Sequence, residues 1–153
     1  MKIQIEVDEE IREDEVIIRC SEINSTIQKI QEVIKQSSQK VNLTFYKDNM
    51  EYYLQLKTIL FFETSGNGID AHTLEETYKV KNKLYELEEI LPDNFVRVSK
   101  STIVNINHIH SIDRNITSSS LIQFNKSYKQ VYVSRIYYKQ LRQRLGERRN
   151  YET

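Results

Sequence analysis

The sequence predicts a mainly β protein of the α+β class, in which a small β-β-α segment precedes a larger antiparallel β domain. Apolar and polar residues alternate over many short stretches, as is typical of half-buried strands. Helical spacing of apolar residues occurs in only three places, and one proline and three glycines leave no long linker. The 153 residues suffice for one ordinary domain with a small appendage.

The β-β-α segment is predicted over residues 1–38. Apolar residues alternate over 3–7, and a second apolar stretch, 16–18, follows an acidic turn. From Ser21 the apolar residues take helical spacing, at Ile23, Ile27, Ile30, Val33 and Ile34. Because about 38 residues rarely fold alone, we expect this segment to pack on the second domain or on a copy of itself.

Residues 39–153 are predicted to form the larger domain. A short acidic helix over 82–91 is stopped by Pro92. A final helix is expected to start after Ser134 as its N-cap and to stop at Gly146. Short strands are expected at 41–45, 51–56, 59–62, 69–72, 77–80, 95–98, 102–106, 109–113, 121–124 and 130–133, with turns at 47–49 and 125–127.

The charge is unevenly distributed along the chain. Lys+Arg and Asp+Glu both number 22, and this neutrality by itself argues against nucleic acid as a partner. Residues 94–153, however, carry 11 basic and 3 acidic side chains, while residues 63–93 carry 3 basic and 8 acidic ones. A basic C-terminal third favours a surface that binds a polyanion, the alternative being a solvated surface balanced by the acidic segments.

Several function classes lack their sequence signals. The longest apolar run, 59–62, is too short for a membrane helix, and no secretory signal is evident, so a cytoplasmic location is expected. No phosphate-binding glycine loop and no HExxH motif occurs, and His108 with His110 lacks a third metal ligand. Cys20 is expected to be a small core residue. We therefore expect no enzyme, no cofactor and no metal site.

Three polar segments beside strands are candidate DNA contacts. In residues 63–68 the Asn67 amide can bond a base edge and Gly68 allows close approach, although a plain hairpin turn is an equal alternative. Arg135 at the strand-to-helix turn can reach a guanine. Lys139 shares a basic stripe with Arg135 on the final helix. Residues 97–101 supply phosphate-binding groups, namely Ser99, Lys100 and Ser101.

The order of these segments resembles the LytTR family of bacterial DNA-binding domains over roughly residues 40–146. The matching stretches are Ile-Leu-Phe-Phe-Glu at 59–63, Leu-Tyr-Glu-Leu-Glu-Glu-Ile-Leu-Pro at 84–92, Phe-Val-Arg-Val-Ser-Lys-Ser-Thr-Ile-Val-Asn at 95–105, Ile109, and Val-Ser-Arg-Ile-Tyr at 133–137. One departure is Ser99, where many members have His; the departure leaves open which contact this position makes and does not affect the predicted fold. The resemblance implies a mostly antiparallel fold whose loops insert into DNA grooves near Asn67, Ser99-Lys100-Ser101 and Arg135.

The resemblance also bears on regulation. Several members carry a phosphorylated receiver domain, whereas about 38 residues precede the domain here, so we expect control by abundance, dimerisation or a separate partner. We expect a homodimer through residues 1–38 and consider a regulatory partner protein, including a membrane-bound one. The predicted function is a sequence-specific, duplex-DNA-binding bacterial transcriptional regulator. The alternative is a protein-interaction module that retains the fold and binds a partner protein instead of DNA.

Overall fold

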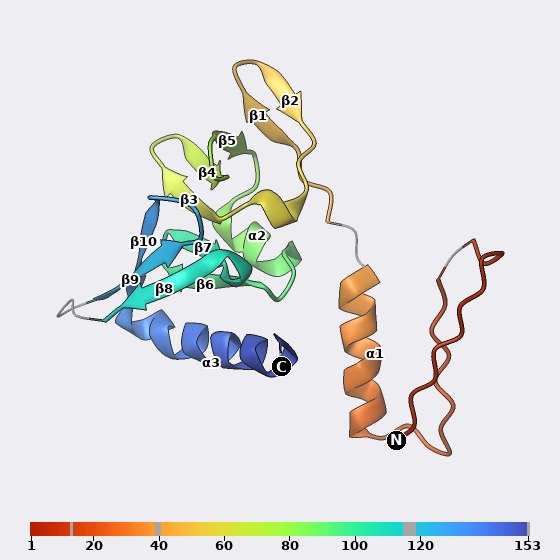
Figure 1. Cartoon of the computed structure of the whole chain (residues 1–153). Helices are drawn as coiled ribbons and strands as arrows, with labels where there is room; N and C mark the ends of the chain where they lie inside the picture. The colour runs from red at the N-terminus through yellow and green to blue at the C-terminus, as the bar shows by residue number, and fades with distance from the viewer. Residues whose placement is uncertain (13, 39–40, 115–118, 153) are drawn as a thin grey trace. The chain divides into compact units, whose positions relative to one another are not determined.

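The computed structural model describes residues 1–12, 14–38, 41–114 and 119–152 (Figure 1). The chain forms two compact units, Met1–Gln39 and Lys40–Thr153. None of the helices described in these ranges has the length and hydropathy needed to cross a membrane.

In the first unit, α1 spans Ser25–Ser38. The Asn24 side chain starts this helix, because its Oδ1 accepts hydrogen bonds from the backbone N–H groups of Thr26 and Ile27, both at 3.1 Å. Ile27, Ile30 and Ile34 are half-buried along one side of α1. The predicted helix is thus confirmed, with a later start than Ser21.

The two strands predicted ahead of this helix are wrong. Residues 1–12 and 14–24 contain no strand, and the apolar side chains of both stretches are exposed, with Ile3 and Ile5 each 83% exposed. Cys20 is also exposed and is not a core residue. A strand requires a hydrogen-bonding neighbour and a layer that covers its apolar face, and the described part of this unit supplies neither.

The second unit is built on antiparallel strands, which confirms the mainly β prediction. Among the described residues, one sheet has seven strands in the order β2-β1-β5-β4-β3-β7-β6, and a smaller one has the order β10-β9-β8. The first sheet comprises β1 Phe45–Lys47, β2 Met50–Tyr52, β3 Phe61–Ser65, β4 Gly68–His72, β5 Thr77–Val80, β6 Phe95–Ser99 and β7 Thr102–Asn105. The second comprises β8 Ile109–Asp113, β9 Ser119–Phe124 and β10 Gln130–Ser134. The other elements are the 3-10 turns Leu56–Thr58 and Ile106–His108, and the helices α2 Leu84–Ile90 and α3 Arg135–Glu152.

Two apolar clusters fill the second unit, one on each face of β3. Phe62 is fully buried with Ile103 and Leu87, and its ring centroid lies 5.8 Å from that of Phe95. Phe61 points to the other face, where it stacks on Phe124 at 5.3 Å in a cluster that joins the two sheets to α3. This alternation explains the uninterrupted apolar run at 59–62, because both faces of this strand are covered.

Asn105 is a buried polar residue whose side chain links three segments of the chain. Its Nδ2 donates to the Ile59 carbonyl at 3.0 Å, and its Oδ1 accepts from Asn94 Nδ2 at 3.0 Å and from the Asn107 N–H at 3.1 Å. The side chain is 1% exposed, so these bonds meet the requirement that a buried amide be satisfied.

The ends of several elements differ from the predictions. The first hairpin is shorter than 41–56, although its turn at Asp48-Asn49, where both residues have positive φ, is confirmed. Ser134 does not cap α3: it remains in β10 opposite Ser119, and its buried hydroxyl has no hydrogen-bond partner. Gly146 does not end α3, because an isolated glycine is tolerated inside a helix at a cost of about 1 kcal/mol.

Candidate nucleic-acid interface

The β3–β4 connection is a tight hairpin turn, as expected from the alternative interpretation of residues 63–68. Residues Glu63 to Ser65 belong to β3, Gly68 begins β4, and Ser65 is paired with Gly68. Only Gly66 and Asn67 form the turn, and Gly66 has a φ of +26°, which a side chain would strain. The turn presents the exposed Asn67 side chain at the end of the hairpin.

The β6–β7 connection is a second tight turn. Ser99 ends β6 and is paired with Thr102 across a register shift that begins at Arg97. The Ser99 hydroxyl accepts a hydrogen bond from the Ser101 N–H at 3.2 Å, which holds the turn closed. Lys100 and Ser101 are exposed, and Ser99 is half-buried. All three predicted residues therefore lie in one turn.

These two turns lie side by side. In β3, Glu63 is paired with Thr102 of β7, and one residue further the Thr64 N–H donates to the Ser101 carbonyl at 2.8 Å. Asn67 and Lys100 thus belong to adjacent turns at the same end of the sheet. Asn67 and Lys100 are 33 positions apart in sequence, and the pairing of β3 with β7 brings their turns together.

Arg97 shapes the β6–β7 turn from within. Its Nε donates to the Ser99 carbonyl at 2.7 Å, and its Nη2 donates to the Lys100 carbonyl. The remaining donor, Nη1, forms an ion pair with Glu88 of α2 at 2.7 Å. The guanidinium fork therefore fixes two turn carbonyls and anchors them to α2. The sequence motif pointed to this arginine without indicating that it serves the turn rather than the surface.

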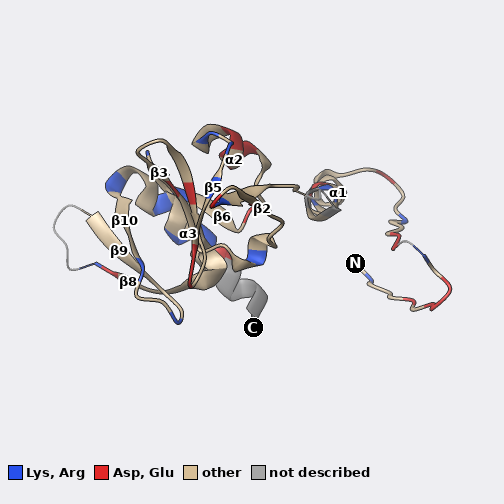
Figure 2. Ribbon diagram, turned by 90° about the horizontal axis from the view of Figure 1, so that it is seen from above, with Lys and Arg blue, Asp and Glu red and all other residues tan. Residues whose placement is uncertain are grey.

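The third predicted segment lies at the β10–α3 junction. Arg135 is the first residue of α3, and both Arg135 and Lys139 are exposed. The opposite side of the helix is buried as expected, with Leu141 fully buried and Tyr138 and Leu145 packed on the same cluster. Arg142 is exposed as well, so Arg135, Lys139 and Arg142 form the outward stripe that the spacing predicts, and Figure 2 shows Lys and Arg along this helix.

The direction of α3 relates this stripe to the two turns. Helix α3 packs on β6 and β10, and Arg144 Nη1 lies 3.9 Å from Asp93 Oδ2, just before β6 begins. Because β6 runs away from Asp93 towards Ser99, we infer that the first turn of α3, with Arg135, lies towards the β6–β7 turn.

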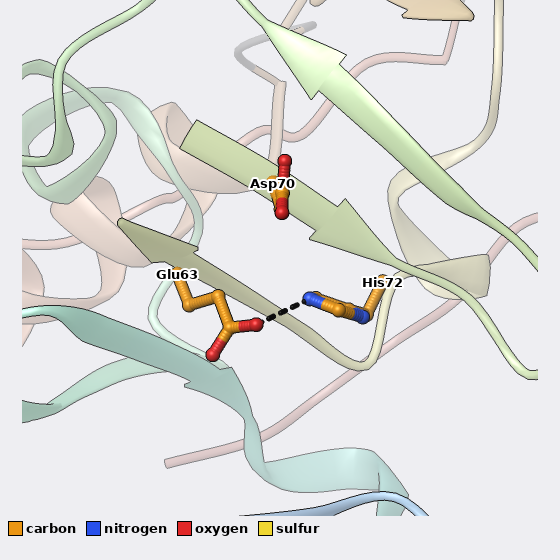
Figure 3. A group of neighbouring side chains, drawn as sticks. All are labelled: Glu63, Asp70 and His72. Carbon is orange, nitrogen blue, oxygen red and sulfur yellow. Dashed lines mark hydrogen bonds and ion pairs between the residues drawn. The ribbon is translucent and has the colours of Figure 1, made fainter. Parts of the chain in front are cut away.

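A polar cluster that sequence reasoning missed lies on one face of β3 and β4 (Figure 3). Glu63 Oε1 is 2.7 Å from His72 Nε2, and ligand atoms of Glu63, Asp70 and His72 all lie within 4.8 Å of one another. Three such ligands can hold a divalent metal ion such as zinc. The only available signal was the two-residue spacing of Asp70 and His72, and the pairing of Glu63 with Asp70 is fixed by strand register.

Two lysines already balance the charge of this cluster. Lys79 Nζ lies 2.5 Å from Asp70 Oδ1 in an ion pair, and Lys129 Nζ lies 3.5 Å from His72 Nδ1. Burial raises the pKa of Asp70, but Lys79 and Ser65 together lower it below its usual value. Burial lowers the pKa of His72, and the nearby Glu63 only partly opposes this. The carboxylates of Glu63 and Asp70 are therefore accompanied by two nearby ammonium groups.

The other histidines considered as ligands do not meet. His108 Nε2 lies 2.5 Å from the Lys57 carbonyl oxygen, and His110 Nδ1 lies 3.1 Å from Asn125 Oδ1. Each imidazole thus has a different partner in a different element.

Comparison with known proteins identifies the second unit. A Staphylococcus aureus protein (strain NCTC 8325), named as an uncharacterized HTH-type transcriptional regulator, is 28% identical over 147 residues, which cover 95% of this chain and 99% of that protein. A protein of the same name from strain MRSA252 is 27% identical with the same coverage. Among solved structures, the LytTr DNA-binding domain of a Bacillus cereus protein described as a methyl-accepting/DNA response regulator superposes with a TM-score of 0.64 at 28% identity. That match covers 70% of this chain and 99% of the other.

Residues 49–146 match the LytTr DNA-binding domain family, a range that contains both turns and the β10–α3 junction. Since this range is well over half of the chain, the protein belongs to the LytTR family of DNA-binding domains.

Proposed function

We propose that this protein is a bacterial transcriptional regulator that binds specific sequences of duplex DNA through the two turns and the β10–α3 junction. The observation that best supports this proposal is the hydrogen bond from the Thr64 N–H to the Ser101 carbonyl at 2.8 Å. It makes one continuous polar edge from two turns that the family resemblance associates with DNA. The name of the Staphylococcus aureus relatives, a transcriptional regulator, agrees with this role.

The three segments have different tasks in this proposal. Asn67 bonds a base edge, and Gly68 lets the hairpin approach the groove closely. Arg135 bonds a guanine through its two terminal nitrogens, while Lys139 contacts a phosphate one helical turn later. The contacts that fix the register of the protein on the duplex come from the β6–β7 turn, namely Ser99, Lys100 and Ser101.

This readout uses turns in place of a helix-turn-helix. Strands β1–β5 separate α1 from α2, and strands β6–β10 separate α2 from α3, so no two helices are consecutive among the described residues. The adjacent turns take the place of a recognition helix, and α3 contributes only its first residues to base recognition.

Selection of bound fragments from a bacterial genomic DNA pool by the full chain tests the proposal. We expect a recurrent motif among the recovered fragments and an affinity that falls steeply with salt, because phosphate contacts release counterions. The Ser101→Ala variant should recover the same motif with weaker binding, since its contact is to phosphate. Recovery of fragments without a motif, or no binding at low salt, would favour the alternative of a protein-interaction module.

We further propose that Met1–Gln39 forms a homodimer contact. The exposed apolar residues of this unit and the apolar side of α1 support a protein partner, and a second copy supplies the neighbouring strands that residues 3–7 and 16–18 lack. Analytical ultracentrifugation of the full chain and of residues 39–153 tests this. A dimer that is lost on truncation is expected. Identical monomers would remove the dimer and leave a different regulatory protein, membrane-bound or not, as the expected partner.

A further inference from the structure

A hollow of about 680 Å³ opens beside the β3–β4 turn. It lies between that hairpin and the connection from β5 to α2. Its floor is largely apolar and its rim carries amides and lysines. The residues that line it are Thr64, Asn67, Gly68, Ile69, Lys79, Val80, Lys81, Asn82, Lys83 and Leu84.

The three rim lysines alternate with residues that anchor the segment in the core. Val80 and Leu84 are 5% and 7% exposed, so the backbone from β5 into α2 is fixed on both sides of Lys81 and Lys83. Both lysines are exposed. Residues 63–93 carry 3 basic and 8 acidic side chains, so the net charge of this segment gives no indication of the basic rim.

The charge of Lys79 is already used within the protein. Its Nζ forms the ion pair with Asp70 and donates to Ser65 Oγ at 2.8 Å. Lys79 therefore holds the hairpin beside the hollow and is not an available phosphate ligand.

Lys81 and Lys83 are placed differently. Their ammonium groups lie over aromatic rings, Lys81 Nζ at 4.6 Å from the Tyr46 ring centroid and Lys83 Nζ at 6.0 Å from that of Tyr85. A cation–π contact orients an ammonium group while leaving its N–H groups open to an anion. Figure 2 shows acidic residues on α2, the helix that follows Lys83, and one residue of α2, Glu88, is already paired with Arg97.

We propose that this hollow receives the sugar-phosphate backbone of the duplex next to the bases read by the β3–β4 turn. Lys81 and Lys83 bind two phosphates of that backbone. Because Asn67 lines the same hollow, a strand whose base meets Asn67 continues over this rim. The inference rests on the proposed function and adds a fourth contact, from a segment outside the three sequence-predicted ones.

Salt titration of full-chain binding to a duplex recovered in the selection tests the inference. Each phosphate contact contributes about 0.9 to the slope of log affinity against log salt. Lys81→Gln and Lys83→Gln should each lower the slope by about that amount and leave the selected motif unchanged. The matched control is Lys126→Gln, which removes the same charge from the exposed β9–β10 turn and should leave the slope at the parent value. Equal slopes in all four proteins would overturn the inference.

Neutral methylphosphonate substitutions at single phosphates provide a second measurement. The parent should lose affinity when the phosphate that Lys81 contacts is neutralised. The Lys81→Gln variant, which already lacks this contact, should bind the neutralised duplex as well as it binds the unmodified one. Independent losses from the two changes would show that Lys81 does not contact that phosphate. If the parent selects no motif, the proposed function itself fails. If the parent does select a motif, but the losses from Lys81→Gln and from phosphate neutralisation add at every flanking position, only the proposed contact at the hollow is refuted.

Discussion

Both units of this protein carry short apolar stretches that predict strands, with opposite structural outcomes. Ile3 and Ile5 in the first unit are each 83% exposed, whereas Phe61 and Phe62 in β3 are 3% and 0% exposed. Strand β3 is paired on both sides, by β4 and β7, and covered on both faces by apolar clusters. An apolar stretch therefore marks residues that are suited to burial. A strand forms only where neighbouring strands and a covering layer exist.

The largest effect is expected from a substitution in the apolar core of the second unit. Phe62→Ala removes a fully buried ring that packs on Phe95, so the unfolding free energy of the second unit should fall by about 3–5 kcal/mol. Ile5→Ala removes an exposed side chain and should change it by less than about 0.5 kcal/mol. Urea denaturation of both variants measures the difference. A loss for Ile5→Ala that approaches that of Phe62→Ala would show that residue 5 is buried in this core.

A smaller effect is expected in the turn that the core supports. Arg97→Ala removes donors to the Ser99 and Lys100 carbonyls and should lower the unfolding free energy by about 1.5 kcal/mol, near the lower limit for charged hydrogen bonds because this turn is at the surface. Binding to the selected duplex should weaken at every salt concentration with an unchanged salt slope, since Arg97 orders the turn without touching phosphate.

Two further variants separate this positioning role from a phosphate contact. Arg97→Lys keeps the charge but lacks the planar fork, so it should bind as weakly as Arg97→Ala. Glu88→Gln removes the anchor in α2 and should also weaken binding. If Arg97 instead contacted phosphate, Glu88→Gln would leave binding intact or improve it, and the salt slope of Arg97→Ala would fall.

The smallest effect is expected from pH. Burial lowers the pKa of His72 in the folded protein below its ordinary value near 6.5, so the unfolded chain binds more protons in the window below that value. The contribution of His72 to the unfolding free energy should therefore be complete above about pH 7 and decline as the pH falls through 6. In urea denaturation, the unfolding free energy of the His72→Gln variant should decline less over the same pH window. Parallel curves for the two proteins would contradict the lowered pKa.

Local pattern predicted most of the second unit. The strand at 77–80, the turn at 125–127 and the apolar side of the last helix follow from periodicity and turn residues, and they form as expected. The family motif located the two turns and the β10–α3 junction. These features are local, so the sequence carries enough information to place them.

The remaining features depend on register between distant residues. The side-by-side turns need Glu63 opposite Thr102, and the Glu63–Asp70–His72 cluster needs Glu63 opposite Asp70. The ion pair that anchors Arg97 to Glu88 requires α2 next to β6. The strands predicted over 3–7 and 16–18 do not form, because a local apolar pattern does not supply a partner strand.

The most direct test of the account is the ratio of affinities for the selected duplex and for a scrambled duplex, measured by fluorescence anisotropy at one fixed salt concentration. For Arg135→Ala this ratio should fall by the factor that corresponds to about 1–3 kcal/mol of binding free energy, because a base contact is lost. Lys139→Ala should weaken binding to both duplexes and preserve the ratio. An Arg135→Ala variant that keeps the ratio of the parent would contradict base reading at the β10–α3 junction.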